Sequence, residues 1–179
     1  MKNNTKNDKF FIYKYEGEIR DLLLKYKFND KAYLSNFFAQ KISKNEDAIK
    51  FIKKYDVIIP VPLHKKRFEE RGYNQSELII KKVIINKKIV DNVENNALKK
   101  IKNLKPQSKN GLNDRMNEIK GAYFVENNER IKNKKILLFD DIYTTGSTAK
   151  ECKKILINSG VKEVGIMTIA RDFLTKEVS

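Results

Sequence analysis

The sequence is poor in the residues on which several protein classes depend. Its only cysteine is Cys152, which excludes a disulfide within one chain and a cysteine-based metal cluster. No apolar run approaches the roughly 18–20 residues of a membrane-spanning helix. The basic first residues lack the apolar core and the small-residue cleavage site of a secretory signal. We therefore expect a soluble protein of a reducing compartment, the cytoplasm.

Acidic residues are also scarce relative to basic ones. Asp and Glu number 23 against 38 Lys and Arg, which gives a net charge of +15 over 179 residues. Lysine outnumbers arginine by 32 to 6, a bias that an A/T-rich genome could produce. Such a charge attracts polyanions, but it more often marks a solvated surface than a dedicated nucleic-acid site. The length fits one domain, and 40% apolar residues suffice for a core.

Apolar spacing predicts helices first and an alternation of strands and helices afterwards. Residues 19–52 have helical spacing, interrupted at Asn29 and Asp30. The later expected elements are strands over 56–62, 89–93, 121–125, 135–139 and 164–170 and helices over 74–85 and 145–158. Residues 95–120 are polar and basic and predict a long mobile loop. We expect an α/β fold with a mostly parallel sheet flanked by helices, in which an N-terminal helical region (1–55) precedes the core (56–179).

The segment that carries chemistry is ILLFDDIYTTGST, residues 136–148. An apolar strand runs into Asp140 and Asp141, and a loop rich in threonine and glycine then opens a helix. Ligands of open α/β sheets bind beyond the carboxyl ends of the strands. Gly146 permits close approach of the backbone, and the amides and dipole of the helix start favour a phosphate. Without a Walker lysine, the loop is not a nucleoside triphosphate site.

Two carboxylates beside a phosphate loop suit a sugar 5-phosphate. Asp140 and Asp141 can accept hydrogen bonds from vicinal sugar hydroxyls while the loop holds the phosphate. The alternative is purely structural, with two ordinary strand-end acids and a helix cap. Cys152 shares helical spacing with the apolar residues around it, which predicts a place in the core.

These motifs resemble a known family. Residues 136–148 resemble the phosphoribosyl pyrophosphate (PRPP) signature of type I phosphoribosyltransferases. The block PVPLH (60–64), followed by Arg67 and by RGYNQ (71–75), resembles the ComF family of competence-associated phosphoribosyltransferase-like proteins. Residues 15–20, 27–28, 106–107, 121–123 and 170–171 extend the resemblance over roughly 13–172. The cysteine-rich zinc module with which many members begin does not carry over to this sequence.

The resemblance implies a type I phosphoribosyltransferase-like fold with a helical hood, and a role for each motif. Asp140 and Asp141 would be the catalytic pair that holds the ribose hydroxyls. The 5-phosphate would be bound by Thr144, Thr145, Gly146, Ser147 and Thr148. The pyrophosphate would lie against Val61, Pro62, Leu63, His64, Arg67 and Arg71, with the amides of Val61, Leu63 and His64 as donors. A mobile loop carrying Gln107 and Arg115 would close over the substrate.

The implied reaction displaces pyrophosphate from C1 of PRPP with a nitrogen nucleophile. Mg²⁺ would accompany the pyrophosphate, with no metal ligand predicted in the chain itself. His64 is either a general acid or pyrophosphate ligand, or a surface side chain. The family setting implies a part in DNA uptake. The alternatives are a non-catalytic factor that binds single-stranded DNA or the import machinery, and a PRPP-sensing regulator. Residues 86–135 carry a net charge of +7, which favours contact with a polyanion.

Overall fold

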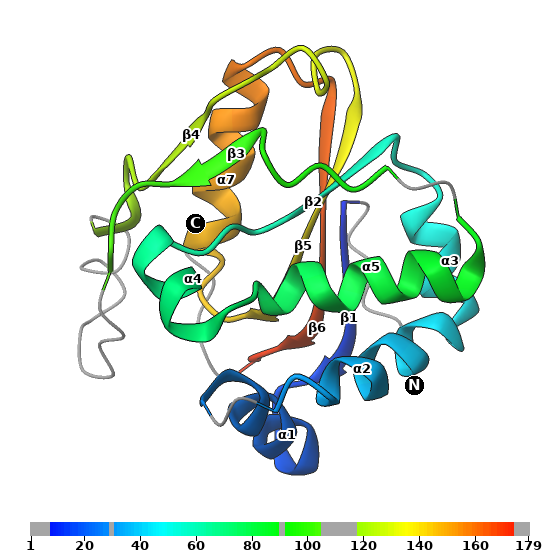
Figure 1. Ribbon diagram of the computed structural model, residues 1–179. Coiled ribbons are helices and arrows are strands. Elements are labelled where there is room, and N and C mark those ends of the chain that lie inside the picture. Colours follow the sequence, from blue (N-terminus) through cyan, green and yellow to red (C-terminus); the bar gives the residue numbers. More distant parts are fainter. Residues whose placement is uncertain (1–7, 29–30, 90–91, 105–117, 174–179) are drawn as a thin grey trace.

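A four-stranded parallel sheet lies at the centre of the computed structural model, which describes residues 8–28, 31–89, 92–104 and 118–173 (Figure 1). The strand order is β1-β6-β5-β2. The strands are β1 (Lys9–Lys14), β2 (Val57–Pro60), β5 (Lys135–Tyr143) and β6 (Glu163–Arg171). The central strands are almost continuously apolar, as expected for parallel strands covered on both faces. The expected α/β fold with a parallel sheet is confirmed.

Helices cover the two faces of the sheet unequally. One face packs against α1 (Gly17–Phe28), α2 (Leu34–Ser43), α3 (Glu46–Ile52) and α5 (Gln75–Lys87), forming the hood-side core. The other face packs against α7 (Ser147–Asn158), forming the α7-side core. Cys152 is fully buried in this second core, as predicted. Among the described residues, no helix is long and apolar enough to cross a membrane.

Strand β5 serves both cores because successive strand residues point to opposite faces of a sheet. Leu137 and Phe139 belong to the hood-side core, whereas Ile136 and Leu138 belong to the α7-side core. All four side chains are at most 1% exposed. Packing of these four side chains therefore fixes the direction of β5 before Asp140 and the side of the sheet toward which each residue points.

The strand β1 was not predicted. Its partner is β6, with Phe10 opposite Met167. Phe10 belongs to the hood-side core and Phe11 to the α7-side core. The strand has only six residues, of which the first and last are lysines, so its local sequence predicts a strand only weakly. The pairing that stabilises this edge strand is with residues near the other end of the chain. A strand from the first 55 residues thus belongs to the central sheet, while the division at residue 55 stays a prediction.

Two other expected elements differ in the structure. Within residues 95–120, expected as a mobile loop, Leu98–Lys100 form β3, which pairs antiparallel with β4 (Tyr123–Val125). The buried side chain of Leu98 anchors β3, although its lysine neighbours conceal the strand in the sequence. The strand expected over 89–93 is reduced, in its described part, to a single bridge between Val93 and Ile58.

Candidate functional site

The predicted motifs meet at the carboxyl ends of β2 and β5. These strands are neighbours, with Pro60 opposite Phe139, so the chain segments that follow them emerge side by side. Together they border a cleft of about 470 Å³. Its lining includes the predicted residues Val61, Pro62, Leu63, Arg67, Arg71, Asp140, Asp141, Thr144 and Thr148. It also includes residues that sequence reasoning did not assign to the site, among them Lys27, Ser76, Lys100 and Tyr123.

The phosphate loop (residues 144–148) is held by its own hydroxyls. The hydroxyls of Thr145 and Ser147 lie 2.9 Å apart, and the Ser147 amide donates to Thr145 Oγ1 at 3.3 Å. Both side chains are buried, so they shape the loop from within. Thr144 and Thr148 instead line the cleft. The five predicted residues therefore divide into an inner pair that shapes the loop, two threonines that line the cleft, and Gly146 between them.

Gly146 is required at its position in this loop. Its φ of +77° lies in the left-handed region, which a residue with a side chain rarely adopts. A Cβ at this position would also collide with the Tyr143 hydroxyl beneath the loop. Tyr143 is fixed in turn, because Lys9 Nζ donates to its hydroxyl at 3.0 Å and the Phe11 ring lies 5.1 Å away.

The acid pair (Asp140 and Asp141) is held by donors from three directions. Asp140 Oδ1 accepts from Ser76 Oγ at 3.2 Å and from the Asp141 amide at 2.9 Å. Asp141 is buried, and its Oδ1 lies 2.9 Å from Lys27 Nζ. Burial and the neighbouring charge of Asp141 raise the pKa of Asp140 to about 7. Burial alone would lower the pKa of Lys27, but the charges of Asp141 and Asp140 raise it above its ordinary value.

The pyrophosphate loop (residues 61–64) is bound to both the sheet and α5. The Val61 amide donates to the carbonyl of Phe139 at 2.9 Å, so the expectation that it serves a ligand is wrong. Asn74 Nδ2 donates to the carbonyl of Val61 at 3.0 Å. Asn74 Oδ1 accepts from the amides of Ser76 and Glu77 and so caps α5. One asparagine thus joins the loop to the helix that supplies Ser76 to the acid pair.

The RGYNQ block (71–75) forms the turn from the end of α4 (Lys65–Arg71) to the start of α5. Gly72 ends α4 with a φ of +75°, and its amide donates to the carbonyl of Phe68 at 2.7 Å. The carbonyl of Gln75 then accepts from the hydroxyl of the fully buried Tyr26 at 3.0 Å. This bond ties the last turn of α1 to the start of α5, which brings Lys27 to the acid pair.

His64 caps a helix rather than lining the cleft. Its Nδ1 accepts from the Lys66 amide at 3.2 Å at the start of α4. Arg67 and Arg71 on that helix do line the cleft, and Arg67 Nη1 also lies 3.3 Å from Glu70 Oε2. The structure favours the interpretation of His64 as a surface side chain with a local role.

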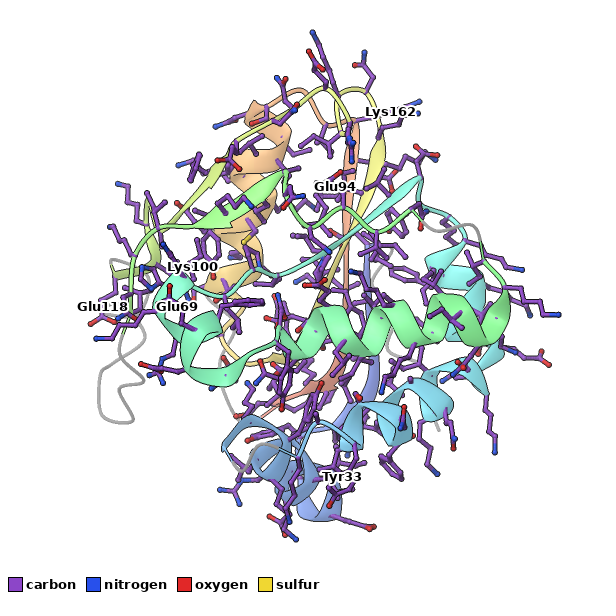
Figure 2. The ribbon with its side chains drawn as sticks, in the orientation of Figure 1. Tyr33, Glu69, Glu94, Lys100, Glu118 and Lys162 are labelled. Atoms are coloured by element: carbon purple, nitrogen blue, oxygen red, sulfur yellow. The ribbon has the colours of Figure 1, made fainter. Side chains whose placement is uncertain are left out.

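Lys100 is a cation of the cleft that sequence reasoning missed. It is the last residue of β3 (Figure 2). Its backbone forms a bridge with that of His64. Its Nζ is 5.5 Å from the centroid of the Tyr123 ring. Burial, together with the like charge of Arg67, lowers the pKa of Lys100, although Asp140 acts in the opposite direction. The four cleft cations, Lys27, Arg67, Arg71 and Lys100, outnumber the acid pair, as a polyanionic ligand requires.

Gln107 and Arg115, predicted for the mobile loop, lie outside the described residues. Both flanks of their segment are anchored. The Ile101 amide donates to the carbonyl of Ala122 at 2.8 Å, and Lys102 Nζ donates to the carbonyl of Lys120 at 2.6 Å. On the far side, the Gly121 amide donates to Glu151 Oε1 of α7 at 2.6 Å.

Comparison with known proteins places the chain in a family. The phosphoribosyl transferase domain matches residues 71–177, more than half of the chain. The chain is 30% identical over 149 residues to Competence protein ComFC of Bacillus subtilis, covering 83% of this chain and 58% of that protein. It is 31% identical over 160 residues to Competence protein ComFC of Streptococcus pneumoniae, covering 89% of this chain and 66% of that protein.

The chain thus spans 58% and 66% of the lengths of these two relatives. It is also similar to a hypoxanthine phosphoribosyltransferase from Staphylococcus aureus, with a TM-score of 0.46 and 17% identity over 79% of this chain and 67% of that one. The domain match covers the acid pair, the phosphate loop and the turn before α5. The chain therefore belongs to the phosphoribosyl transferase domain family, and within it to the ComF type.

Proposed function

We propose that the cleft binds PRPP. The acid pair accepts hydrogen bonds from the ribose hydroxyls, and the phosphate loop receives the 5-phosphate. The pyrophosphate lies against residues 61–63, within reach of Arg67, Arg71 and Lys100. The observation that carries this proposal is that one cleft is lined by Thr144 and Thr148 of the phosphate loop, by the acid pair, and by the cations Arg67, Arg71 and Lys100. That lining matches a diol with a phosphate on either side.

Mg²⁺ belongs to the proposed substrate rather than to the protein. Among the residues that the structure describes, no group of three or more His, Cys, Asp or Glu side chains is placed to hold a metal ion. Mg²⁺ in proteins keeps several waters and binds readily to phosphate oxygens of a substrate. We therefore propose that the ion arrives on the pyrophosphate, which it partly neutralises.

The proposed reaction is transfer of the phosphoribosyl group to a nitrogen nucleophile. A bond from nitrogen to C1 forms as the bond from C1 to the pyrophosphate oxygen breaks, and pyrophosphate leaves with the electron pair. Arg67, Arg71 and Lys100 stabilise the negative charge that the leaving group gains. The acid pair and the phosphate loop fix the ribose so that C1 faces the acceptor.

We further propose that the protein works in the cytoplasm and supports DNA uptake. The names of its competence relatives support this setting. They also favour a second candidate, a non-catalytic factor that binds single-stranded DNA or the import machinery. A DNA contact predicts affinity that falls steeply with salt concentration. Lys99 and Lys102 are suitable positions to test it, whereas Lys100 is not, because it lines the cleft.

Calorimetric titration with PRPP and Mg²⁺ tests the proposed ligand. The control is the double variant D140N/D141N, which keeps the shape of the acid pair but removes its charge. We expect the wild type to bind and the variant to lose binding while it keeps its circular dichroism spectrum. Wild-type protein that does not bind PRPP would refute the proposal and leave the DNA candidate standing.

A pyrophosphate-release assay then separates an enzyme from a regulator. Wild-type protein is incubated with PRPP, Mg²⁺ and a panel of nucleobases and amines. Release that depends on one acceptor and is lost in D140N/D141N supports transfer. Binding without release for any acceptor supports a PRPP-sensing regulator instead.

A further inference from the structure

We infer that Lys27 is a positioning residue that favours the doubly ionised form of the acid pair, which can accept hydrogen bonds from a diol. This inference deepens the proposed function and rests on it for the identity of the ligand. It concerns a residue of α1, far in sequence from the motif that it serves.

The contact is short and shielded from solvent. Lys27 Nζ lies 2.9 Å from Asp141 Oδ1, and the two side chains are only 26% and 8% exposed. An ion pair at this burial is screened far less by water and salt than one on the surface. Lys27 also lies in the last turn of α1, where the helix dipole favours a positive charge.

The position of Lys27 is determined by its neighbours. The preceding residue, Tyr26, is fully buried, and its hydroxyl donates to the carbonyl of Gln75. The next residue on α5, Ser76, donates to Asp140. The end of α1 and the start of α5 are thus fixed to each other, and each supplies one donor to the acid pair.

The acid pair needs such a cation. Burial and the repulsion between two adjacent carboxylates raise the pKa of Asp140 to about 7, even though the charge of Lys27 acts to lower it. A protonated carboxyl loses acceptor capacity toward sugar hydroxyls. Without Lys27 the pair would retain one proton to a higher pH, and a diol would have to displace that proton on binding.

Other titratable groups face the pair from each packed element. They are Tyr15 and Tyr26 at α1, Arg67 and Arg71 on α4, Lys100 on β3, Tyr123 on β4 and Cys152 on α7. Burial raises the pKa values of Tyr26, Tyr123 and Cys152, which keeps them neutral near pH 7. Lys100 has a lowered pKa, so its variant must be measured in parallel.

The first experiment needs no ligand. Carboxyl carbons of ¹³C-labelled aspartate are followed by NMR from pH 4 to 10 in wild type and K27M, with D140N and D141N to assign the signals. We expect the midpoint of the acid pair to rise by about one pH unit or more in K27M and to stay near its wild-type value in K27R. An unchanged midpoint in K27M would overturn the inference. K27Q replaces K27M should the latter fail to fold.

The second experiment measures PRPP affinity with Mg²⁺ at pH 6.5 and pH 9. We expect the ratio of the K27M to the wild-type dissociation constant to fall by about tenfold between the two pH values. K25M, which removes an exposed lysine of the same helix, should give a ratio near one at both. K100M should weaken binding without this pH dependence in the neutral range.

The outcomes separate the inference from the proposed function. A ratio for K27M that is the same at both pH values would overturn the inference, because Lys27 would then act only as a charge on the substrate or as a structural contact. Wild-type protein without affinity for PRPP would refute the proposed function, and the NMR titration would still decide the role of Lys27.

Discussion

The two ends of the cleft are built from different chemical groups. The phosphate loop offers hydroxyls and backbone amides, and it is held by the buried Thr145–Ser147 contact and by Gly146 above Tyr143. The pyrophosphate end offers cationic side chains on short pieces of secondary structure. Its helix α4 has seven residues, none of them buried, and its strand β3 has three. One end is therefore a preformed cradle, and the other is a set of charges carried by short elements.

This difference suggests a division of labour. In the proposed reaction the 5-phosphate is part of both substrate and product, so a rigid cradle suits it. In the same proposed reaction the pyrophosphate is held as its charge grows and is then released, which suits cationic side chains on short elements. Asn74 limits the movement of the second end, because it ties the pyrophosphate loop to α5.

The largest expected effect is that of G146A. An alanine would have to adopt a φ of +77° and would collide with the Tyr143 hydroxyl. We expect a loss of roughly 1–3 kcal/mol in the free energy of unfolding and loss of binding to ribose 5-phosphate. Denaturant unfolding and calorimetry measure the two. A variant as stable as the wild type, with normal affinity, would show that the loop is not a rigid cradle.

The double variant R67A/R71A tests the opposite end. Each guanidinium can make charge-assisted hydrogen bonds to a phosphate, so we expect pyrophosphate affinity to fall by about tenfold or more. Affinity for ribose 5-phosphate should stay within about twofold of the wild type, because that ligand uses the other end. Equal losses for both ligands would contradict the division between the two ends.

Asp140 between the two ends predicts a pH dependence of stability. Its pKa is near 7 in the folded protein and lower in the unfolded chain, so folding binds a proton between these values and wild-type stability falls as pH rises from about 4 to 7. D140N lacks this group. We expect its unfolding free energy relative to wild type to increase over that range and to level off above it. A difference independent of pH would place the Asp140 pKa at its ordinary value.

The smallest expected effect is that of H64A. His64 caps the short helix α4 through one contact at the surface, so we expect a cost of at most about 1 kcal/mol. PRPP affinity should change by less than about threefold. A loss of tenfold or more would assign His64 to the pyrophosphate after all and extend the cationic end of the cleft.

The two ends of the cleft also differ in how far they could be predicted from the sequence. The acid pair and the phosphate loop lie within nine consecutive residues, and their order alone predicted a sugar phosphate site. The cation that neutralises the pair, Lys27, comes from a helix whose lysines look alike in the sequence. Lys100 and Ser76 were missed because nothing in the local sequence marks either of them as a residue of the cleft. Which lysine enters a cleft depends on tertiary contacts, such as the bond from Tyr26 to Gln75, that have no local pattern.

The elements of the fold also differ in how far they could be predicted from the sequence. The buried strands and the parallel sheet followed from apolar runs, because burial on both faces demands them. The edge strand β1 and the short strand β3 did not, because each is stabilised by a partner distant in the chain. The Val61 amide was likewise assigned to a ligand, although β5 is its partner.

The alternation along β5 has a consequence for how this protein can change over evolutionary time. Ile136 and Leu138 face one core, and Leu137 and Phe139 face the other. Insertion or deletion of one residue before Asp140 would exchange the two sets of side chains and carry the acids to the wrong sides. Substitutions can accumulate in this strand, whereas changes in its length cannot. Differences in length among descendants of this chain should therefore fall in its loops, with β5 keeping its register.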